Sequence, residues 1–165
     1  MFSSLPLPHG NMPTVGYGLW NVRKDKSSSL KKSFIGSGYR HVDSAANYGN
    51  EKEVNKEKVN KYLDFFSKVG EGIEEPIKDG ICSREDLFIT SKLWNTYPEH
   101  VEDACKRSLA DLGLDYLDLY LIHFPISLKY VPFDVRYPPG WVPDPDISDS
   151  MEFTPLTISE TWKAM

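Results

Sequence analysis

The chain has 165 residues, enough for one domain, and its 40% hydrophobic and 26% charged residues are close to the globular average. A net charge of −5 gives no indication of a nucleic-acid partner or an anionic membrane surface. No apolar run reaches the roughly 18 residues of a membrane span, and residues 1–6 lack the regions of a secretory signal. We therefore expect a single domain over 1–165 in the cytosol, with Cys82 and Cys105 as free thiols.

The first half of the chain predicts short strands separated by helices. His-Gly-Asn at 9–11 is a turn signal, and short strands on either side of it predict a hairpin at the bottom of a barrel. Glycines and apolar periodicity set the remaining boundaries. The expected elements are a hairpin over 6–13, a strand over 15–20, a helix over 27–36, a strand over 40–43 and a mostly helical stretch over 51–80.

The second half continues the alternation. A strand over 87–92 precedes Thr96-Tyr97-Pro98-Glu99, whose capping-box spacing predicts a helix that begins there and ends at Gly113. Spacing of four residues predicts the ion pairs Glu102/Lys106 and Asp103/Arg107 on that helix. The apolar run over 117–124 is typical of a strand covered on both faces. A long loop over 125–156 and a second capping box, Thr157 to Glu160, complete the chain.

Four side chains of different chemistry lie at or just after the ends of these strands. Asp43, Lys92 and His123 each end a strand-like run, and Tyr48 follows the first of them. Because parallel β/α proteins assemble their sites from the carboxyl ends of successive strands, we expect the four to meet. Lysine beside tyrosine stabilises a phenolate, and a carboxylate holds the lysine. This combination predicts a proton-transfer site with Tyr48 as donor and a neutral His123 orienting a carbonyl group.

Each of these residues also has a structural interpretation when taken alone. An aspartate at a strand end is often a helix cap, a loop tyrosine is usually packing, and a lysine after a strand is usually solvated. Only the ordered combination favours catalysis. Aromatic residues gather at the same strand ends and predict either rim packing or an apolar substrate pocket. They are Trp20, Trp94 and Phe124.

The sequence resembles the aldo-keto reductases in three long motifs. Gly-Tyr-Arg-His-Val-Asp-Ser-Ala-Ala-Asn-Tyr-Gly-Asn-Glu (38–51) is similar to their first signature. Asp-Leu-Phe-Ile-Thr-Ser-Lys-Leu-Trp-Asn (86–95) and Leu-Asp-Leu-Tyr-Leu-Ile-His-Phe-Pro (117–125) match two more, and residues 110–118 are similar to the second signature. Lys129 to Pro132 and Tyr-Pro-Pro-Gly (137–140) point to the aldose and xylose reductase branch.

This resemblance implies an α/β fold of the (β/α)8 TIM-barrel family and an NADPH/NADP+-dependent oxidoreductase that reduces small carbonyl compounds, aldoses among them. It places Tyr48 on the family's proton donor and Lys92, Asp43 and His123 on its partners. Pocket positions would be filled by Trp20, Asn47, Trp94, His123 and Phe124. Leu19, Trp20 and Asp43 would lie near the nicotinamide and its ribose. The cofactor would carry out the hydride chemistry, which the protein would orient.

The chain also departs from the family pattern. A TIM barrel typically needs about 250 residues, so we expect a partial barrel with a hairpin and about four βα units. Residues 55–68 look like a helical insertion or a retained intron, and Asn21 replaces a common lysine. The loop after Asn95 also looks shorter than in the family. Open strand edges would favour self-association.

Three alternative functions remain open at this point. The first is a truncated or splice-variant fragment without catalytic activity of its own. The second is a non-enzymatic channel subunit that keeps the barrel, which the intact tetrad disfavours. The third is a dehydratase or hydrolase, which the lack of metal-ligand clusters and of a GxSxG sequence disfavours. The choice between NADPH and NADH and the physiological substrate also stay open.

Overall fold

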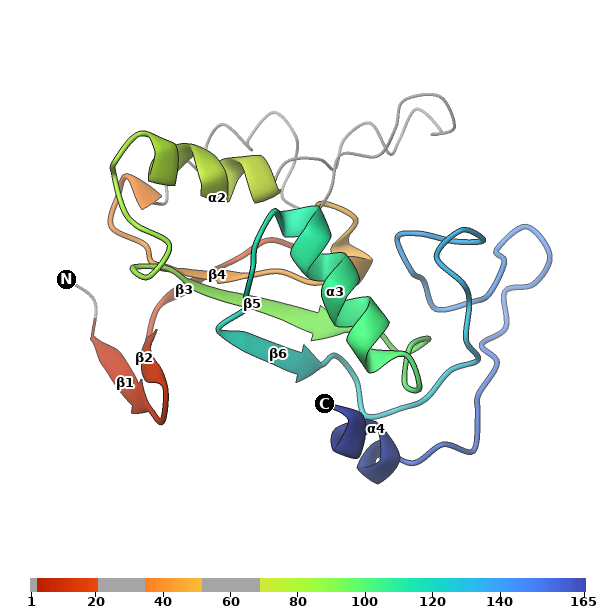
Figure 1. Ribbon diagram of the computed structural model, residues 1–165. Helices are drawn as coiled ribbons and strands as arrows, with labels where there is room; N and C mark the ends of the chain where they lie inside the picture. The colour runs from red at the N-terminus through yellow and green to blue at the C-terminus, as the bar shows by residue number, and fades with distance from the viewer. Residues whose placement is uncertain (1–2, 21–34, 52–68) are drawn as a thin grey trace.

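Four parallel strands form the centre of the computed structural model, which describes residues 3–20, 35–51 and 69–165 (Figure 1). They are hydrogen-bonded in chain order and consist of β3 (Gly16–Gly18), β4 (His41–Asp43), β5 (Phe88–Leu93) and β6 (Leu119–Ile122). Parallel strands in sequential order are how a β/α barrel begins. The predicted alternation is confirmed for the described residues. The insertion over 55–68, most of the helix over 27–36 and Asn21 lie outside them.

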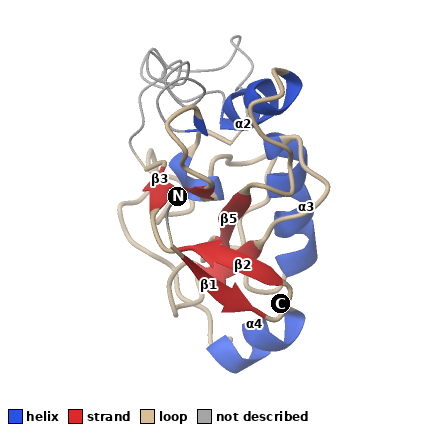
Figure 2. Ribbon diagram, turned by 90° about the vertical axis from the view of Figure 1, so that its left-hand side faces the viewer, coloured by secondary structure: helices blue, strands red, loops and turns tan. Residues whose placement is uncertain are grey.

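The predicted hairpin is present at the amino-terminal end of this sheet. Strands β1 (Ser4–Leu7) and β2 (Gly10–Pro13) pair antiparallel, and they face the viewer in Figure 2. His41, the first residue of β4, connects the hairpin to the sheet. One ring nitrogen lies 3.3 Å from the carbonyl oxygen of Pro13, and the other lies 3.2 Å from the hydroxyl of Thr90 on β5.

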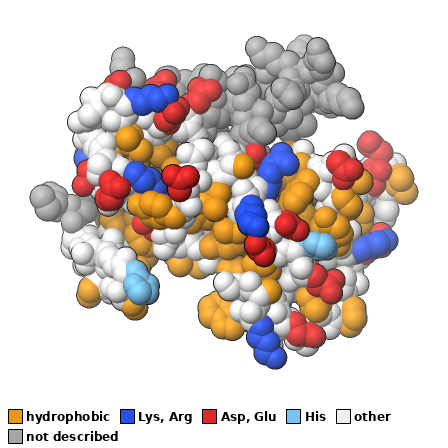
Figure 3. All heavy atoms as spheres, viewed as in Figure 1, with side chains coloured by type: hydrophobic (Ala, Val, Ile, Leu, Met, Phe, Trp, Pro, Cys, Tyr) orange, Lys and Arg blue, Asp and Glu red, His pale blue; other side chains and the backbone are white. Residues whose placement is uncertain are grey.

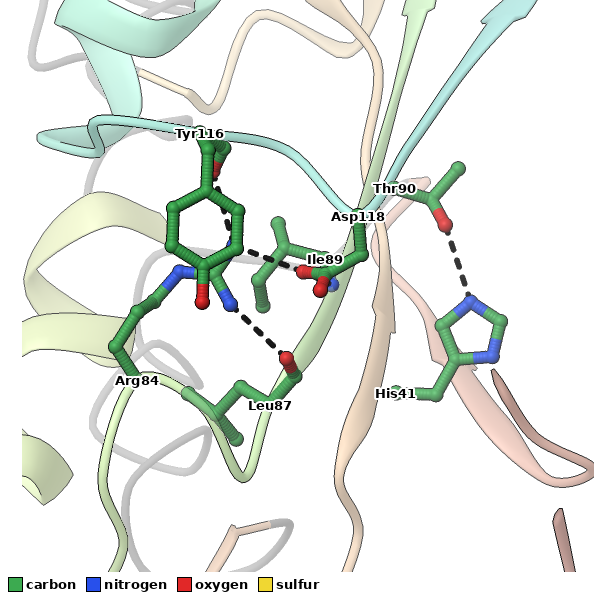
Figure 4. Close-up of polar contacts among 7 residues, drawn as sticks. All are labelled: His41, Arg84, Leu87, Ile89, Thr90, Tyr116 and Asp118. Carbon is green, nitrogen blue, oxygen red and sulfur yellow. Dashed lines mark hydrogen bonds and ion pairs between the residues drawn. The ribbon is translucent and has the colours of Figure 1, made fainter. Parts of the chain in front are cut away.

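An arginine fixes the same end of β5 and β6 (Figure 4). Arg84 lies 2.8 Å from the carboxylate of Asp118 and donates to the backbone carbonyl groups of Leu87 and Tyr116. The same Asp118 oxygen accepts the backbone N–H of Ile89. Because this group of contacts involves only the amino ends of the strands, it sets their register without touching the opposite end of the sheet.

Two helices, α2 (Val69–Lys78) and α3 (Val101–Leu112), cover one face of the sheet (Figure 1). They pack closely, because a Cβ atom on Gly70 would lie 2.9 Å from the backbone oxygen of Leu112. The main core lies between these helices and the strands. It consists of Leu19, Ile35, Val42, Val69, Ile73, Cys82, Leu87, Ile89 and Leu112.

The predicted start of α3 is wrong. The helix begins at Val101 after His100, which makes no side-chain cap, and not at the Thr96–Glu99 box. Thr96 and Tyr97 are buried, and the Tyr97 ring lies 4.7 Å from that of Phe133 in the long loop. Packing against that loop therefore overrides the local capping signal. Gly113 ends α3 in the left-handed conformation, as predicted.

The second capping box is confirmed. Thr157 accepts a hydrogen bond from the backbone of Glu160, whose carboxylate accepts the Thr157 backbone N–H at 2.8 Å, and α4 (Ile158–Ala164) follows. This contact is local, so no tertiary packing overrides it. Among the described residues, no helix has the length and apolar character needed to cross a membrane.

Strand β6 is less buried than its apolar sequence predicts. Its residues are half-buried and Leu121 remains 38% exposed. The reason is topological, since β6 is the last strand of the described sheet and no further strand covers its edge. In the view of Figure 1, hydrophobic side chains are exposed across the middle of the molecule (Figure 3). The expectation of cover on both faces is therefore wrong for this part of the chain.

Candidate active site

Lys92, at the carboxyl end of β5, is the centre of the site. Its Nζ atom lies 2.8 Å from Oδ1 of Asp43 and 3.1 Å from Oη of Tyr48, and it donates to the backbone oxygen of Ser44 at 2.8 Å. Register explains this meeting. Asp43 pairs with Thr90 on β5, and Lys92 lies two residues further on the same face.

Tyr48 ends a short 3-10 helix, η3 (Ala46–Tyr48), directly after β4. Gly49 then takes a left-handed conformation with φ of 71°, which ends the turn and keeps the phenol over the strand ends. An ammonium group can only donate, so Oη of Tyr48 accepts the bond from Lys92. The phenolic proton of Tyr48 is consequently available to a ligand in the pocket.

His123 lies beside this pair at the end of β6. Its ring meets Tyr48 edge to face at 5.8 Å and Trp94 at 5.1 Å between ring centroids. Burial, together with the positive charge of Lys92, lowers the pKa of His123 to about 4, and Asp43 only partly opposes this. The imidazole is therefore neutral at pH 7 and can hydrogen-bond a carbonyl oxygen without competing as the acid.

These groups open into a pocket of about 300 Å³. Aromatic rings form most of its wall, and a few polar groups converge in it, as in many small-molecule sites. Trp20 lies at the edge of the pocket and is 69% exposed. The lining residues are Trp20, Asn47, Tyr48, Trp94, His123, Phe124 and Trp141.

Of the nine predicted site residues, six line this pocket, and Lys92 and Asp43 are connected to it through the contact of Lys92 with Tyr48. Leu19 and Asn47 differ in detail from the prediction. Leu19 is fully buried in the core and is not part of the lining. Its backbone N–H instead donates to the backbone oxygen of Asp43 at 2.9 Å. Asn47 lines the pocket, but its amide donates to the backbone oxygen of Pro139 at 2.7 Å and thereby holds the long loop.

Trp141 is the pocket residue that the sequence did not reveal. It lies 4.7 Å from Trp94 and 4.9 Å from Phe124 between ring centroids, and the Trp94 indole donates to the backbone oxygen of Gly140 at 3.0 Å. The loop that carries it has no periodicity. Its position directly after Tyr-Pro-Pro-Gly was the only signal available.

The long loop 125–156 lies beyond the carboxyl ends of the strands (Figure 1), and α3 holds it in place. Arg107 lies over the ring of Tyr137 at 4.1 Å and pairs with Asp111 at 2.9 Å. The predicted Asp103/Arg107 pair is therefore wrong, whereas Glu102/Lys106 is present. The Asp111 side chain is 0% exposed, whereas Asp103 is exposed. A buried carboxylate without a partner is costly, so Arg107 pairs with Asp111 and not with Asp103.

Replacing Arg107 with alanine is expected to lower the free energy of unfolding by about 2 kcal/mol. This is below the roughly 3–5 kcal/mol of a fully buried pair, because Arg107 is partly exposed. Urea denaturation measures the change. Lys106→Ala, which breaks the exposed pair on the same helix, is the control and should cost at most about 0.5 kcal/mol. Equal losses in the two variants would contradict the role of Arg107.

Comparison with known proteins agrees with this geometry. The sequence model of the Aldo/keto reductase family matches residues 13–165. The chain is 48% identical over 157 residues to the NAD(P)H-dependent D-xylose reductase of Aspergillus niger, across 94% of this chain and 44% of that protein. It thus spans less than half the length of the relatives that it matches.

Solved structures give the same result. An aldose reductase from Schistosoma japonicum superposes with a TM-score of 0.73 at 34% identity, over 98% of this chain and 47% of that one. An aldo-keto reductase complexed with NADPH superposes with a TM-score of 0.68 at 28% identity, over 99% and 42%. The family match extends over nearly the whole sequence. This chain therefore belongs to the aldo/keto reductase family, whose fold is the (β/α)8 barrel.

Proposed function

We propose that this chain carries the proton-transfer half of a carbonyl reductase, which reduces aldehydes and ketones, including aldoses, to alcohols with NADPH. The contact that supports this best is the position of Lys92 between the phenol of Tyr48 and the carboxylate of Asp43. Xylose reductase and aldose reductase relatives favour a sugar-like or small carbonyl substrate.

Tyr48 would donate its proton to the carbonyl oxygen as negative charge develops there. Lys92 would stabilise the phenolate that remains, because its ammonium group is already 3.1 Å from the phenolic oxygen. Asp43 would hold Lys92 in that position and balance its charge. The neutral His123 would hydrogen-bond the same carbonyl oxygen and direct it toward Tyr48.

The residues present fit a nicotinamide cofactor. Trp20 leaves a broad ring surface open at the edge of the pocket. Asp43 uses one carboxylate oxygen for Lys92 and keeps 37% of its side chain exposed, enough to accept a ribose hydroxyl. Trp20 and Asp43, supported by the backbone of Leu19, would therefore hold the nicotinamide riboside. NADPH, when bound, would supply the hydride for the carbonyl carbon.

Cofactor binding and turnover by the purified chain test this proposal. Titration with NADPH should quench tryptophan fluorescence saturably, and an aldose or small aldehyde should then be reduced with loss of NADPH absorbance. Asp43→Asn is the matched variant, because it keeps the shape of the side chain and removes the charge that balances Lys92. Absence of both binding and turnover would overturn the proposal for the chain by itself.

The open edge of β6 favours a second candidate, a fragment of the family that has no catalytic activity of its own. Leu121, Phe124 and Ile126 are exposed along this edge or just after it. An uncovered parallel strand is a site for pairing with another chain. Self-association through this edge should appear as a dimer or larger species in light scattering. A monomer that turns over aldehyde would reject this candidate.

A cytosolic location is proposed on the basis of the thiols. Cys82 and Cys105 are both free cysteines in the described structure. Free cysteines are usual in reducing compartments and less so in secreted proteins. Fluorescence microscopy of the tagged chain would show a diffuse cytosolic signal if this is right and an organellar pattern if it is wrong.

Replacing Trp141 with alanine is expected to raise the KM for small aldehydes about tenfold and to leave the affinity for NADPH unchanged. The ring packs on Trp94 and Phe124 and lines the pocket. The proposed cofactor contacts are Trp20 and Asp43, which the substitution leaves in place. Steady-state kinetics and fluorescence titration measure the two quantities. Trp162→Ala, at an exposed position on α4, is the control. A fall in kcat at unchanged KM would contradict this assignment.

A further inference from the structure

Glu51 lies three residues after Tyr48, and its carboxyl group is buried. The residue is 2% exposed, and both of its oxygen atoms accept hydrogen bonds from serines. Ser91 on β5 donates to Oε1 at 2.6 Å, and Ser108 on α3 donates to Oε2 at 2.8 Å. This carboxyl group therefore connects the segment after Tyr48 to a strand and to a helix at the same time.

The neighbouring residue makes further connections from the same segment. The Asn50 amide donates to the backbone oxygen of Leu19 at 2.9 Å, just beyond β3, and the Asn50 backbone oxygen accepts the N–H of Val69 at the start of α2. Together, Asn50 and Glu51 fix the end of the segment 44–51 to elements on both sides of β4. The segment has no regular strand pairing of its own to hold it.

The position of Ser91 makes the connection relevant to the site. Ser91 directly precedes Lys92, and adjacent residues of a strand point to opposite faces of the sheet. Lys92 therefore contacts Tyr48 from one face of β5, and Ser91 holds Glu51 from the other. The segment 44–51 passes around the end of the sheet between these two contacts. A displacement of Glu51 would move Tyr48 relative to Lys92.

We propose that Glu51 is a positioning residue, which fixes the segment 44–51 on β5 and α3 so that the phenolic oxygen of Tyr48 stays within hydrogen-bonding reach of Lys92. An apolar side chain could fill the same space at a lower desolvation cost. A carboxyl group with two serine donors also fixes direction. The kinetic consequence rests on the proposed function, whereas the geometric claim does not.

Hydrogen–deuterium exchange tests the geometric claim without any need for activity. Glu51→Ala should raise the exchange of the peptide 44–51, which contains the N–H of Tyr48 bonded to Ala45, by about tenfold. Glu51→Gln keeps one acceptor oxygen and should restore most of the protection. Ser91→Ala removes only one of the two bonds and gives a milder test if Glu51→Ala does not fold.

Asp118→Asn is the control for a general loss of stability. It weakens the ion pair with Arg84 at the amino end of the sheet and touches nothing in the segment 44–51. At matched loss of thermal stability, Asp118→Asn should leave the exchange of peptide 44–51 unchanged. Equal exchange in the Glu51 variants and in this control would overturn the proposal, because Glu51 would then be a general core residue.

Kinetics provide the second readout. In an active chain, Glu51→Ala should lower kcat by about 10- to 100-fold, as expected for a small displacement of a reacting group. The affinity for NADPH should remain within about twofold of the unmodified chain. Recovery of kcat in Glu51→Gln supports positioning, and an unchanged kcat in Glu51→Ala contradicts it. If the unmodified chain reduces no aldehyde, the proposed function fails and the exchange experiment still decides the role of Glu51.

Discussion

Tyr48→Phe is expected to lower kcat for aldehyde reduction by about 10²- to 10⁴-fold, the usual contribution of a positioned general acid. The substitution removes only the hydroxyl group, so the ring keeps its edge-to-face contact with His123. Lys92 also keeps its partners Asp43 and the Ser44 carbonyl oxygen, which should preserve folding and NADPH affinity. Stopped-flow or steady-state absorbance of NADPH, with fluorescence titration of binding, measures both effects.

Tyr116→Phe is the matched control for this substitution. Tyr116 is an exposed tyrosine beside Arg84 at the opposite end of the sheet, and loss of its hydroxyl should leave kcat unchanged (Figure 4). A Tyr48→Phe chain that keeps kcat within tenfold of the original would show that the proton comes from another group. His123 would be a poor replacement, because its imidazole is neutral at pH 7.

Local patterns predicted the parts of the fold that local contacts determine. The helix end at Gly113 and the capping box at Thr157 depend on neighbours close in sequence. The strands at 41–43 and 88–93 pair with distant segments, but their short apolar runs are visible locally. The start of α3 depends instead on Tyr97 packing against Phe133 in a distant loop. No sequence window contains both partners, so the capping signal at Thr96 was misleading.

The candidate site was predictable to the extent that strand register determines it. Asp43, Lys92 and His123 end successive parallel strands, and such ends necessarily lie close together. Trp141 was missed because an irregular loop brings it to the pocket. Glu51 was predicted only as the first residue of a mostly helical stretch over 51–80, whereas the structure buries it outside any described helix, with serines of β5 and α3.

The buried carboxyl group of Glu51 should make the chain less stable as the pH rises toward 7. Burial raises its pKa from 4.5 to about 7, against the opposing effect of hydrogen bonds from Ser91 and Ser108. Between these two values the folded chain keeps a proton that the unfolded chain has lost. The stabilisation is therefore complete below pH 4.5 and is lost as the pH rises to about 7. At about 1.4 kcal/mol per pH unit, the loss is about 3 kcal/mol.

His123 has the opposite effect on the pH dependence of stability, so the contributions of Glu51 and His123 partly cancel in the unmodified chain. Its lowered pKa of about 4 means that the unfolded chain binds the extra proton between pH 4 and 6.5, where stability rises with pH. His123 is only half-buried, and solvent screening makes this rise shallower than the fall due to Glu51. Together, these two groups should give a shallow fall in the free energy of unfolding between pH 5 and 7.

Glu51→Gln separates the two contributions, because an amide does not titrate. In urea denaturation from pH 4.5 to 7.5, the unfolding free energy of the variant should no longer fall with pH. It should show only the rise due to His123. The difference in unfolding free energy between the unmodified chain and Glu51→Gln cancels all other groups. It should shrink by about 3 kcal/mol across this range. A difference that does not change with pH would mean that Glu51 ionises as it does in water. That result would contradict the burial of its carboxyl group between Ser91 and Ser108.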